Sequence, residues 1–427
     1  MDKIKSVHAR QLIDCKCRPM VEVEIKTENG HIGLGSAPTG TSVGMYESFI
    51  LRDGVPADFN GLSVHKAVRN VNELIDPLLH GMDISDQQAI DQKMIEFDGT
   101  ANKSRLGGNS IYSVSIAAFR AAAASANLPT YQYLSRKENG RNIKSIPVPT
   151  CNVINGGVNA GICQPFNEFL IVPYKANDIT EAVQILCLTF DKLGSVIQKF
   201  TGKEPLVGKS YGYASPTEDP HTALELIQEA VDECGYHDKV CFALDCASSE
   251  MFDAKTQTYY LNGRRISGEE LINYTKKLTE DFHFLFIEDL LDENDWNNFA
   301  LAVSQIKTTN IIGDDLIATN PGRLQRAYEE KAVQGFILKP NQVGTLTEAF
   351  QTYHYAKKHG MLAIPSGRAG GVIDDIVMDL SAGLEIPFQK NGAPRSGERI
   401  AKLNFLMRIA DLNPECPLSD LSNIAKF

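Results

Sequence analysis

Polar or charged residues end five short apolar runs at nearly equal intervals between residues 284 and 390. They are Glu288, Asp314, Lys339, Ser366 and Lys390, separated by 26, 25, 27 and 24 residues. Short apolar runs are typical of buried parallel strands, and a strand with its helix and two loops takes about 30 residues. The spacing therefore predicts a repeated β/α unit. Charged groups at strand ends are where a β/α barrel carries its chemistry.

Three carboxylates in this pattern could form a metal site. Asp245 follows the apolar run VCFAL, so it joins Glu288 and Asp314 at the ends of separate predicted strands. In a closed barrel these ends meet around one mouth. Adjacent carboxylates repel one another unless a cation lies between them, and oxygen ligands without His or Cys favour Mg²⁺. The alternative is that each acid only caps the next helix or pairs with a loop amide.

Two lysines and an arginine are expected on the same face of the barrel. Lys339 and Lys390 end predicted strands, and Arg368 lies two residues after Ser366. A divalent cation and a second lysine destabilise an ammonium, so a lysine here could act as a base near neutral pH. Salt bridges to the acids are the alternative. Arg368 is a candidate bidentate clamp for phosphate or carboxylate. A carboxylate on Mg²⁺ with a lysine at its α-carbon would make enolisation feasible.

The segments before these strands predict a separate α+β domain. Residues 3–34 alternate in the manner of antiparallel strands, and helical spacing of apolar residues covers 64–79 and 108–128. The stretch 36–48 is rich in Gly, Ser and Thr, which is typical of a mobile loop, with a plain surface connection as the alternative. A boundary is expected near residue 140, where the segment RKENGRN follows the last helix.

The remaining residues predict a barrel, so we expect domains at 1–135 and 140–427. Asp178 or Thr180 can cap a long helix after the strand EFLIVPY, and Asp219 followed by proline can start another. Ser267 and Glu270 have the spacing of a capping box, and TYYLNGRRI predicts a small hairpin. The expected fold class is α/β, with the α+β domain preceding the barrel.

Composition excludes several classes of function. Hydrophobic residues make up 43% and charged residues 22%, and the net charge is −11, which argues against nucleic acid or an anionic membrane as partner. The nine cysteines are scattered, which favours a reducing, cytoplasmic compartment. We expect no secretory signal and no membrane span, since no apolar run is long enough. The VGKS sequence at 207–210 is no phosphate-binding loop, because Lys203 stands where that motif needs glycine.

The chain resembles the enolase (phosphopyruvate hydratase) family from end to end. The stretches that carry the resemblance are APTGTSVGMYES, PVPTCNVINGG, NEFLIVP, FIEDLLDENDW, GDDLIATNP, LKPNQVGTLTEA and KNGAPRSGERIAKLN. The resemblance implies a modified TIM barrel of the ββαα(βα)₆ kind after the N-terminal domain, and a homodimer. It implies Mg²⁺, two ions per site, and a small anionic phospho- or phosphono-carboxylate as substrate.

The resemblance also implies roles for individual residues. A first Mg²⁺ would be held by Asp245, Glu288 and Asp314, and Ser42 in the loop 36–48 would reach the second. Lys339 would take the α-proton, Lys390 would bind the carboxylate region, Arg368 would bind the phosphate, and Glu168 would be a further site carboxylate.

The chain departs from the family pattern in one half of the site. The family loop Gly-Asp-Glu-Gly-Gly, whose glutamate protonates the leaving hydroxyl, is here Gly208 to Gly212, with Lys209 and Ser210 in place of the two acids. Asn159 stands at the histidine of a second loop, and Ser366 is followed by Gly367 in place of another histidine. We expect Ser366, Asn159, Lys209 and Ser210 to contact the substrate.

Three functions remain open at this level. The first is enolase-like proton abstraction with a changed leaving group or acceptor, as in the related carboxyphosphonoenolpyruvate synthases. The second is ordinary dehydration of 2-phosphoglycerate with a substitute acid. The third is a non-catalytic binding or scaffold protein. A missing general acid typically costs about 10²–10⁴-fold in rate, and changes confined to one pocket favour the first function.

Overall fold

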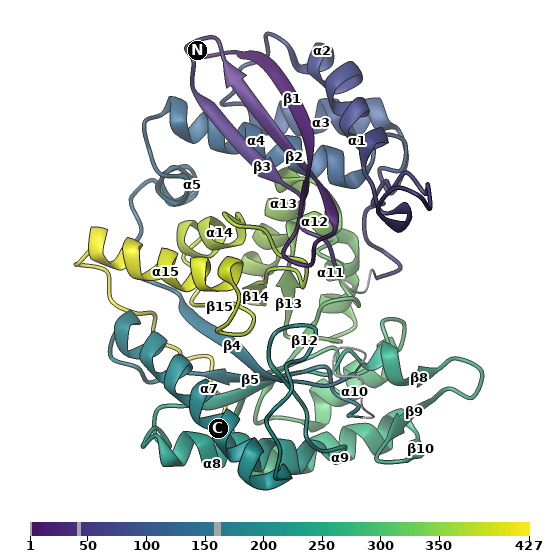
Figure 1. Cartoon of the computed structure of the whole chain (residues 1–427), viewed down its shortest axis with the longest axis vertical. Coiled ribbons are helices and arrows are strands. Elements are labelled where there is room, and N and C mark those ends of the chain that lie inside the picture. The colour runs from purple at the N-terminus through teal and green to yellow at the C-terminus, as the bar shows by residue number, and fades with distance from the viewer. Residues whose placement is uncertain (1, 41–43, 158–163) are drawn as a thin grey trace.

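The chain folds into an N-terminal α+β part that sits on a larger barrel (Figure 1). The computed structural model describes residues 2–40, 44–157 and 164–427. The N-terminal part opens with an antiparallel sheet in the order β1-β2-β3, made of β1 (Ile4–Ile13), β2 (Pro19–Thr27) and β3 (Ile32–Ser36). The predicted strands at 3–34 are confirmed.

Helices cover one face of this sheet. They are α1 (His65–Arg69), a π-helical turn (Asn70–Ile75), α2 (Asp76–Leu79), α3 (Gln87–Asp98) and α4 (Gly108–Ser125). The first three segments are continuous, so the predicted helix 64–79 is present with a π-helical turn inside it. Helix α4 approaches β3 closely because β3 has glycine at its contact: a Cβ atom on Gly33 would lie 2.1 Å from the carbonyl oxygen of Ala117.

Helix α5 (Thr130–Asn139) joins the two parts. The expected domain limit at residue 135 falls inside this helix. Its residue Leu134 packs against Gly383, where an added Cβ would lie 2.8 Å from the Cβ atom of Leu134. Gly383 ends helix α14 (Val377–Gly383) of the barrel, so α5 is packed on the barrel as well as on the N-terminal part.

Eight strands of the described chain form the barrel, and all are short and buried, as the apolar runs predict. They are β4 (Val148–Asn155), β5 (Glu168–Val172), β7 (Cys241–Asp245), β11 (Phe284–Glu288), β12 (Asn310–Gly313), β13 (Gly335–Leu338), β14 (Leu362–Pro365) and β15 (Phe388–Lys390). The order is β14-β13-β12-β11-β7-β5-β4-β15, and a parallel bridge between Ser366 and Lys390 links the two ends. Only the β4–β5 and β5–β7 pairs of this path are antiparallel, so the described strands match the expected ββαα(βα)₆ barrel.

Helices surround the barrel where the spacing predicts them. They are α7 (Ile179–Thr201), α8 (Pro220–Glu233), α9 (Gly268–Asp281), α10 (Trp296–Gln305), α11 (Pro321–Glu329), α12 (Pro340–Val343), α13 (Leu346–Lys358), α14 and α15 (Gly397–Leu412). The Asp178 carboxylate accepts from the amide of Glu181 at 2.8 Å, and Ser267 and Glu270 form both bonds of a capping box. The small strands β8 (Phe252–Asp253), β9 (Thr258–Leu261) and β10 (Arg264–Ile266) confirm the hairpin, and β6 (Tyr213–Ala214) pairs with β4.

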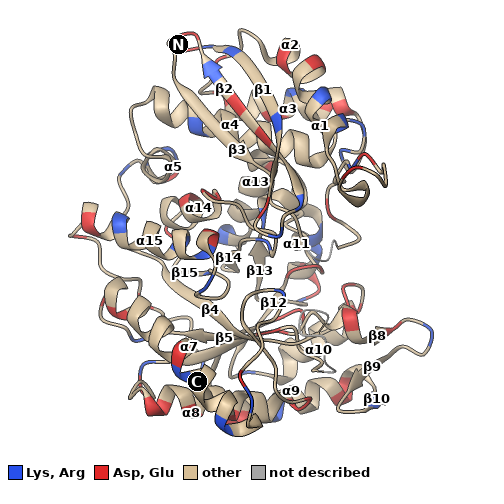
Figure 2. Cartoon of the chain, in the orientation of Figure 1, with Lys and Arg blue, Asp and Glu red and all other residues tan. Residues whose placement is uncertain are grey.

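Charged residues of both signs are interspersed over both parts of the chain (Figure 2). Partly buried polar contacts hold the N-terminal part to helix α13 of the barrel: Lys103 Nζ lies 2.9 Å from Glu348 Oε1, and the Thr347 amide donates to Asp91 Oδ2 at 3.0 Å. Within the described residues, no helix has the length and apolar character needed to cross a membrane.

Candidate active site

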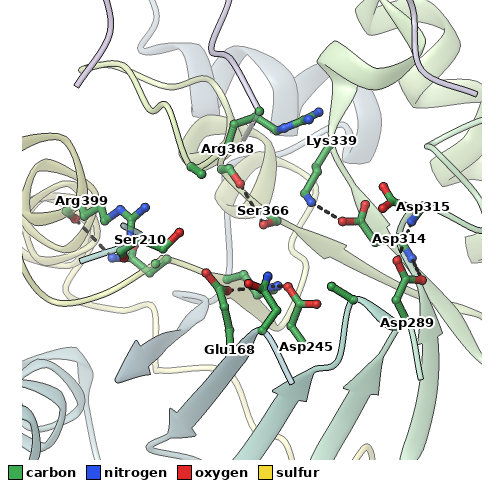
Figure 3. Close-up of a pocket in the computed structure, with 18 of the residues that line it drawn as sticks. Glu168, Ser210, Asp245, Asp289, Asp314, Asp315, Lys339, Ser366, Arg368 and Arg399 are labelled. Carbon is green, nitrogen blue, oxygen red and sulfur yellow. Dashed lines mark hydrogen bonds and ion pairs between the residues drawn. The ribbon is translucent and has the colours of Figure 1, made fainter. Parts of the chain in front are cut away.

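The charged ends of the barrel strands, apart from the fully buried Glu288, line one cavity (Figure 3). Asp245 and Glu288 end neighbouring strands β7 and β11 and are paired in register. Asp314, Lys339 and Ser366 each follow the next strand in order, and Lys390 ends β15. Because parallel strands end at the same edge of a barrel, Asp245 and Lys390, which are 145 positions apart in sequence, meet here. The predicted constellation is brought together.

Lys390 lies at the centre of three carboxylates. Its Nζ is 2.6 Å from Glu288 Oε2, 3.0 Å from Asp245 Oδ2 and 3.6 Å from Glu168 Oε2. Burial by itself would lower the pKa of Lys390, but attraction by Asp245 and then Glu288 raises it well above its usual value. Glu168 is also held by Asn152, whose Nδ2 donates to Glu168 Oε1 at 2.8 Å.

Lys339 forms a second ion pair across the cavity, with Asp314. Its Nζ donates to Asp314 Oδ2, while Gln342 Nε2 donates to Asp314 Oδ1 at 2.9 Å. Burial lowers the pKa of Lys339, but Asp314 and Glu288 outweigh burial and the net direction is upward. These protein groups alone therefore do not lower the pKa of Lys339 toward neutral, as a base that acts near neutral pH requires. The salt bridges offered as the alternative for both lysines are present.

The carboxylates fit a hard cation. Glu288 is fully buried, and its Oε1 has no hydrogen-bond partner among the described residues. Burial, together with repulsion from Asp245, raises the pKa of Glu288 well above its usual value. A buried carboxylate oxygen without a donor costs free energy that a bound cation would recover. The residues at hand offer oxygen ligands, which suit Mg²⁺.

A second carboxylate group shares Asp314 and was missed at the level of sequence. One oxygen from each of Asp289, Asp314 and Asp315 lies within 4.8 Å of the others. Asp289 also accepts the amides of Asp314 and Asp315, both at 2.8 Å, so it orders the turn after β12. Burial, with Asp314 nearby, raises the pKa of Asp315 to about 7. The doublets Glu288-Asp289 and Asp314-Asp315 were the available signal.

Arg368 is bound by an acid from the loop 36–48. Its Nη1 and Nη2 lie 2.7 and 3.0 Å from the two oxygens of Glu47. Both side chains are at most 5% exposed. Glu47 was missed because a glutamate in a Gly/Ser/Thr-rich loop has no spacing signal. Ser42, predicted to reach a second Mg²⁺, lies outside the described residues.

The wall with the departures from the family pattern is lined by Ser210, Gly367, Arg399 and Lys402. Ser210 is buried, and its carbonyl oxygen accepts from Arg399 Nη1. Lys209, by contrast, is exposed and is not among the residues that line the cavity, so its assignment to the substrate gains no support from the geometry.

Two other predicted contacts have different outcomes. Ser366 lines the cavity and donates from Oγ to the carbonyl of Gly367 at 3.1 Å. Asn159 lies outside the described residues. Arg399 and Lys402 were missed, although both lie in the stretch KNGAPRSGERIAKLN, because their helical position alone does not show which face meets the mouth.

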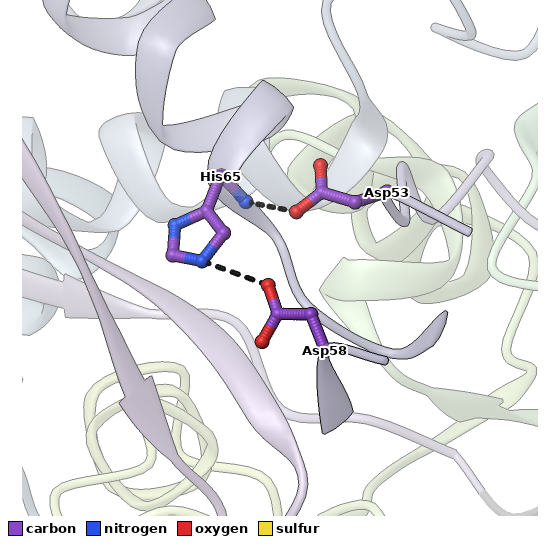
Figure 4. Close-up of side chains that lie close together, drawn as sticks. All are labelled: Asp53, Asp58 and His65. Carbon is purple, nitrogen blue, oxygen red and sulfur yellow. Dashed lines mark hydrogen bonds and ion pairs between the residues drawn. The ribbon is translucent and has the colours of Figure 1, made fainter. Parts of the chain in front are cut away.

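A second acidic cluster, made of Asp53, Asp58 and His65, contains none of the residues that line this cavity (Figure 4). Asp53 accepts the amides of His65 at 2.7 Å and Lys66 at 2.8 Å, and His65 Nε2 is 3.1 Å from Asp58. Asp53 thus satisfies backbone amides in the first turn of helix α1 that have no partner within the helix. Helix capping therefore accounts for the cluster.

Comparison with known proteins supports one family over the whole chain. The domain described as "Enolase, N-terminal domain" matches residues 4–134, and "Enolase, C-terminal TIM barrel domain" matches residues 143–417. The chain is 40% identical to a protein named Enolase from Methanopyrus kandleri, over 100% of this chain and 98% of that protein. It is 42% identical to Enolase of Methanocaldococcus jannaschii, with 95% of each chain covered.

A eukaryotic relative gives the same result. Enolase B of Dictyostelium discoideum is 39% identical over 96% of this chain and 94% of its own length. With both domain matches and full-length relatives in agreement, the chain belongs to the enolase family, whose members are lyases that depend on Mg²⁺.

Proposed function

We propose that the protein is a Mg²⁺-dependent lyase that abstracts the proton α to a carboxylate of a phosphate- or phosphonate-bearing substrate. In this proposal the leaving group or acceptor differs from that of enolase. One observation carries it: Lys339, Asp245 and Asp314 share a cavity whose opposite wall has Ser210 and Gly367 where the family has an acid and an imidazole. The groups for proton abstraction are thus present, whereas those for hydroxide departure are replaced.

Lys339 would hold and move the proton. Its Nζ faces the cavity beside Asp314, which would also be a metal ligand. Lys390 would orient the substrate carboxylate. Arg368 would bind the phosphate or phosphonate once its ion pair with Glu47 is broken. Glu168 stays within ion-pair reach of Lys390 and would tune the charge on it.

Asp245, Glu288 and Asp314 would hold the first Mg²⁺, with Ser42 or the Asp289–Asp315 pair available to a second. Bound Mg²⁺ supplies positive charge that stabilises an enolate-type dianion. The ammonium of Lys390 lies between Asp245 and Glu288, from where it would orient the substrate carboxylate.

Phosphopyruvate hydratase activity on 2-phosphoglycerate is the second candidate. It is supported by the names of the relatives, each at about 40% identity over nearly the full length. In that case water or a residue other than Ser210 would protonate the leaving hydroxide. The two candidates differ in the rate of the second half of the reaction, because a missing general acid costs about 10²–10⁴-fold.

Two measurements on the purified, Mg²⁺-loaded protein test the proposal. The first follows loss of the α-proton from 2-phosphoglycerate in D₂O by NMR, and the second follows formation of phosphoenolpyruvate by absorbance. Proton exchange that outruns phosphoenolpyruvate formation is expected. Turnover within about tenfold of a typical 10 s⁻¹ would favour the hydratase, and absence of exchange with this and other phospho-carboxylates would favour a non-catalytic protein.

We also propose a cytoplasmic homodimer. The eight cysteines described are all free thiols, which supports a reducing compartment. Light scattering after gel filtration tests the oligomeric state: a mass near twice the 47.0 kDa of the chain is expected, and a mass near that of one chain would contradict it. No nucleic acid or membrane partner is proposed.

A further inference from the structure

Lys402 places an ammonium group where position 367 has no side chain. A Cβ atom on Gly367 would lie 2.1 Å from Lys402 Nζ and 3.2 Å from Asp375 Oδ2. Lys402 is 4% exposed and lines the cavity that holds Lys339. The ammonium therefore enters the site next to Ser366 and through the gap that glycine leaves.

The ammonium has little to bind within the described protein. Its one partner is Asp375, with Nζ 3.6 Å from Oδ2, and it donates no hydrogen bond to a described residue. Asp375 Oδ2 likewise accepts no hydrogen bond from a described residue, whereas Oδ1 accepts the Val377 amide at 3.2 Å. A buried ammonium carries three donors that need acceptors. The donors of Lys402 are therefore available to an acceptor group of a ligand in the cavity.

Arg399 extends the positive charge along the same wall, beside Ser210 (Figure 3). It is 4% exposed, its Nε lies 3.3 Å from Glu398, and its guanidinium is 5.0 Å from the ring centre of Tyr211. Burial, followed by the positive charges of Arg18 and Arg399, lowers the pKa of Lys16 nearby.

The acids at this wall are each paired with a cation, Glu398 with Arg399 at 3.3 Å and Asp375 with Lys402 at 3.6 Å. The far side of the cavity is rich in carboxylates instead. Because the Lys402 ammonium lines the cavity and donates no hydrogen bond to a described residue, a ligand that uses both sides would have an anionic group at this wall in addition to one near Lys390.

We propose that Lys402 and Arg399 form a second anion subsite, which binds an additional carboxylate or phosphonate on the substrate. The substrate class is then a phospho- or phosphono-carboxylate with a further oxyanion on the carbon that carries hydroxyl in 2-phosphoglycerate. This inference rests on the proposed function, because it assigns the rebuilt wall of the same site. An acid at 210 would repel such a group, which accounts for Ser210 there.

Calorimetric titration of the Mg²⁺-loaded protein with matched probes tests the subsite. Phosphonoacetate has one carboxylate, 2-phosphonosuccinate adds a carboxylate arm, and 2,3-diphosphonopropionate adds a phosphonate arm. Charge-assisted hydrogen bonds of this kind give about tenfold or more in affinity. We expect at least one two-armed probe to bind about tenfold more tightly than phosphonoacetate, and the better arm identifies the oxyanion.

Two variants assign the gain to Lys402. Lys402→Met removes the charge, and Gly367→Ala displaces the ammonium while leaving the charge in the chain; should the first variant fail to fold in a thermal melt, the second carries the test. In either variant the preference for the two-armed probe should fall to less than about threefold. Lys358→Met, at an exposed position on α13, is the matched control and should keep the full preference.

The possible failures are distinguishable. Equal binding of all three probes by the unaltered protein, or an unchanged preference in both variants, overturns the subsite and leaves proton abstraction by Lys339 intact. If phosphonoacetate does not bind to the Mg²⁺-loaded protein and no α-proton exchange occurs, the proposed function fails, and the subsite fails with it.

Discussion

Arg368 and Glu47 form a bidentate ion pair between the barrel and the N-terminal loop, with nitrogen–oxygen distances of 2.7 and 3.0 Å. The pair lies at the cavity and is almost fully buried. A carboxylate on Arg368 occupies donors that a substrate phosphate would use. Glu47 therefore both ties the loop to the barrel and competes with the anion for the same guanidinium.

Glu47→Ala should separate these two effects. Loss of one partner of a buried ion pair costs about 3–5 kcal/mol, so the free energy of unfolding in urea should fall by about that amount. Affinity for inorganic phosphate should rise, because Arg368 loses its competitor. Glu280→Ala, at an exposed position on α9, should change neither. Weaker phosphate binding in Glu47→Ala would show that Glu47 positions Arg368 and does not compete.

Lys339→Ala tests the base. Removal of a positioned proton acceptor should slow α-proton exchange in D₂O by about 10²–10⁴-fold, since no other lysine follows strand β13 and reaches Asp314 in the described structure. NMR of the substrate proton measures the exchange, and Lys358→Ala is the exposed control. Retention of more than a tenth of the rate in Lys339→Ala would assign proton abstraction to another group.

Ser210→Glu tests the loss of the general acid. It restores a carboxyl group at the wall that Arg399 and Lys402 line. Phosphoenolpyruvate formation from 2-phosphoglycerate should be at least about 10²-fold below the typical 10 s⁻¹ in the unaltered protein and should rise tenfold or more in the variant. A matched Ser210→Gln, without an acid, should give no rise. An equal rise in both would point to side-chain size, and no rise in either would show that the acid alone is insufficient.

Mg²⁺ should stabilise the protein through Glu288. A ligand that binds only the folded state adds RT ln(1 + [L]/Kd), about 2.7 kcal/mol at a hundredfold excess over Kd. Glu288→Gln replaces the buried carboxylate that has an unpartnered oxygen, so the variant should lose most of this gain. Thermal melts with Mg²⁺ and with a chelator measure it, and Glu280→Gln serves as control. An equal Mg²⁺ effect in both variants would place the ion away from Glu288.

Asp379 should introduce a pH dependence of stability outside the site. Burial raises its pKa from 3.8 to about 6, and this is only partly opposed by Arg120, 3.5 Å away. The folded state then binds more protons than the unfolded state between these values, so Asp379 favours folding at acid pH and costs stability as the pH rises toward 6 and above. The cost above pH 6 is about 3 kcal/mol at 1.36 kcal/mol per pKa unit.

Asp379→Asn should remove this dependence. Urea unfolding at pH 5 and pH 7.5 should show the variant gaining stability relative to the unaltered protein as the pH rises. Asp411→Asn, at an exposed position on α15, should follow the unaltered protein. A constant difference between Asp379→Asn and the unaltered protein across this range would mean that Asp379 is ionised throughout it.

The barrel and the chemistry of its strand ends could be predicted from sequence alone. Short apolar runs repeat at the length of one β/α unit, and the repeat places Glu288, Asp314, Lys339 and Lys390 at equivalent positions. This inference works because a parallel barrel brings all strand ends to one mouth. The caps at Asp178 and Ser267 were likewise local, since a helix start depends on three or four neighbouring residues.

Contacts between distant segments were decided only by the tertiary structure. Glu47 meets Arg368 across 321 positions, and no periodicity links a loop glutamate to a strand end. Lys390, assigned to the substrate, also bridges Asp245 and Glu288, which depends on how far the barrel closes. Lys402 reaches the site only because Gly367 leaves the space open. Packing in three dimensions selects such pairs, whereas sequence spacing carries information only along one element.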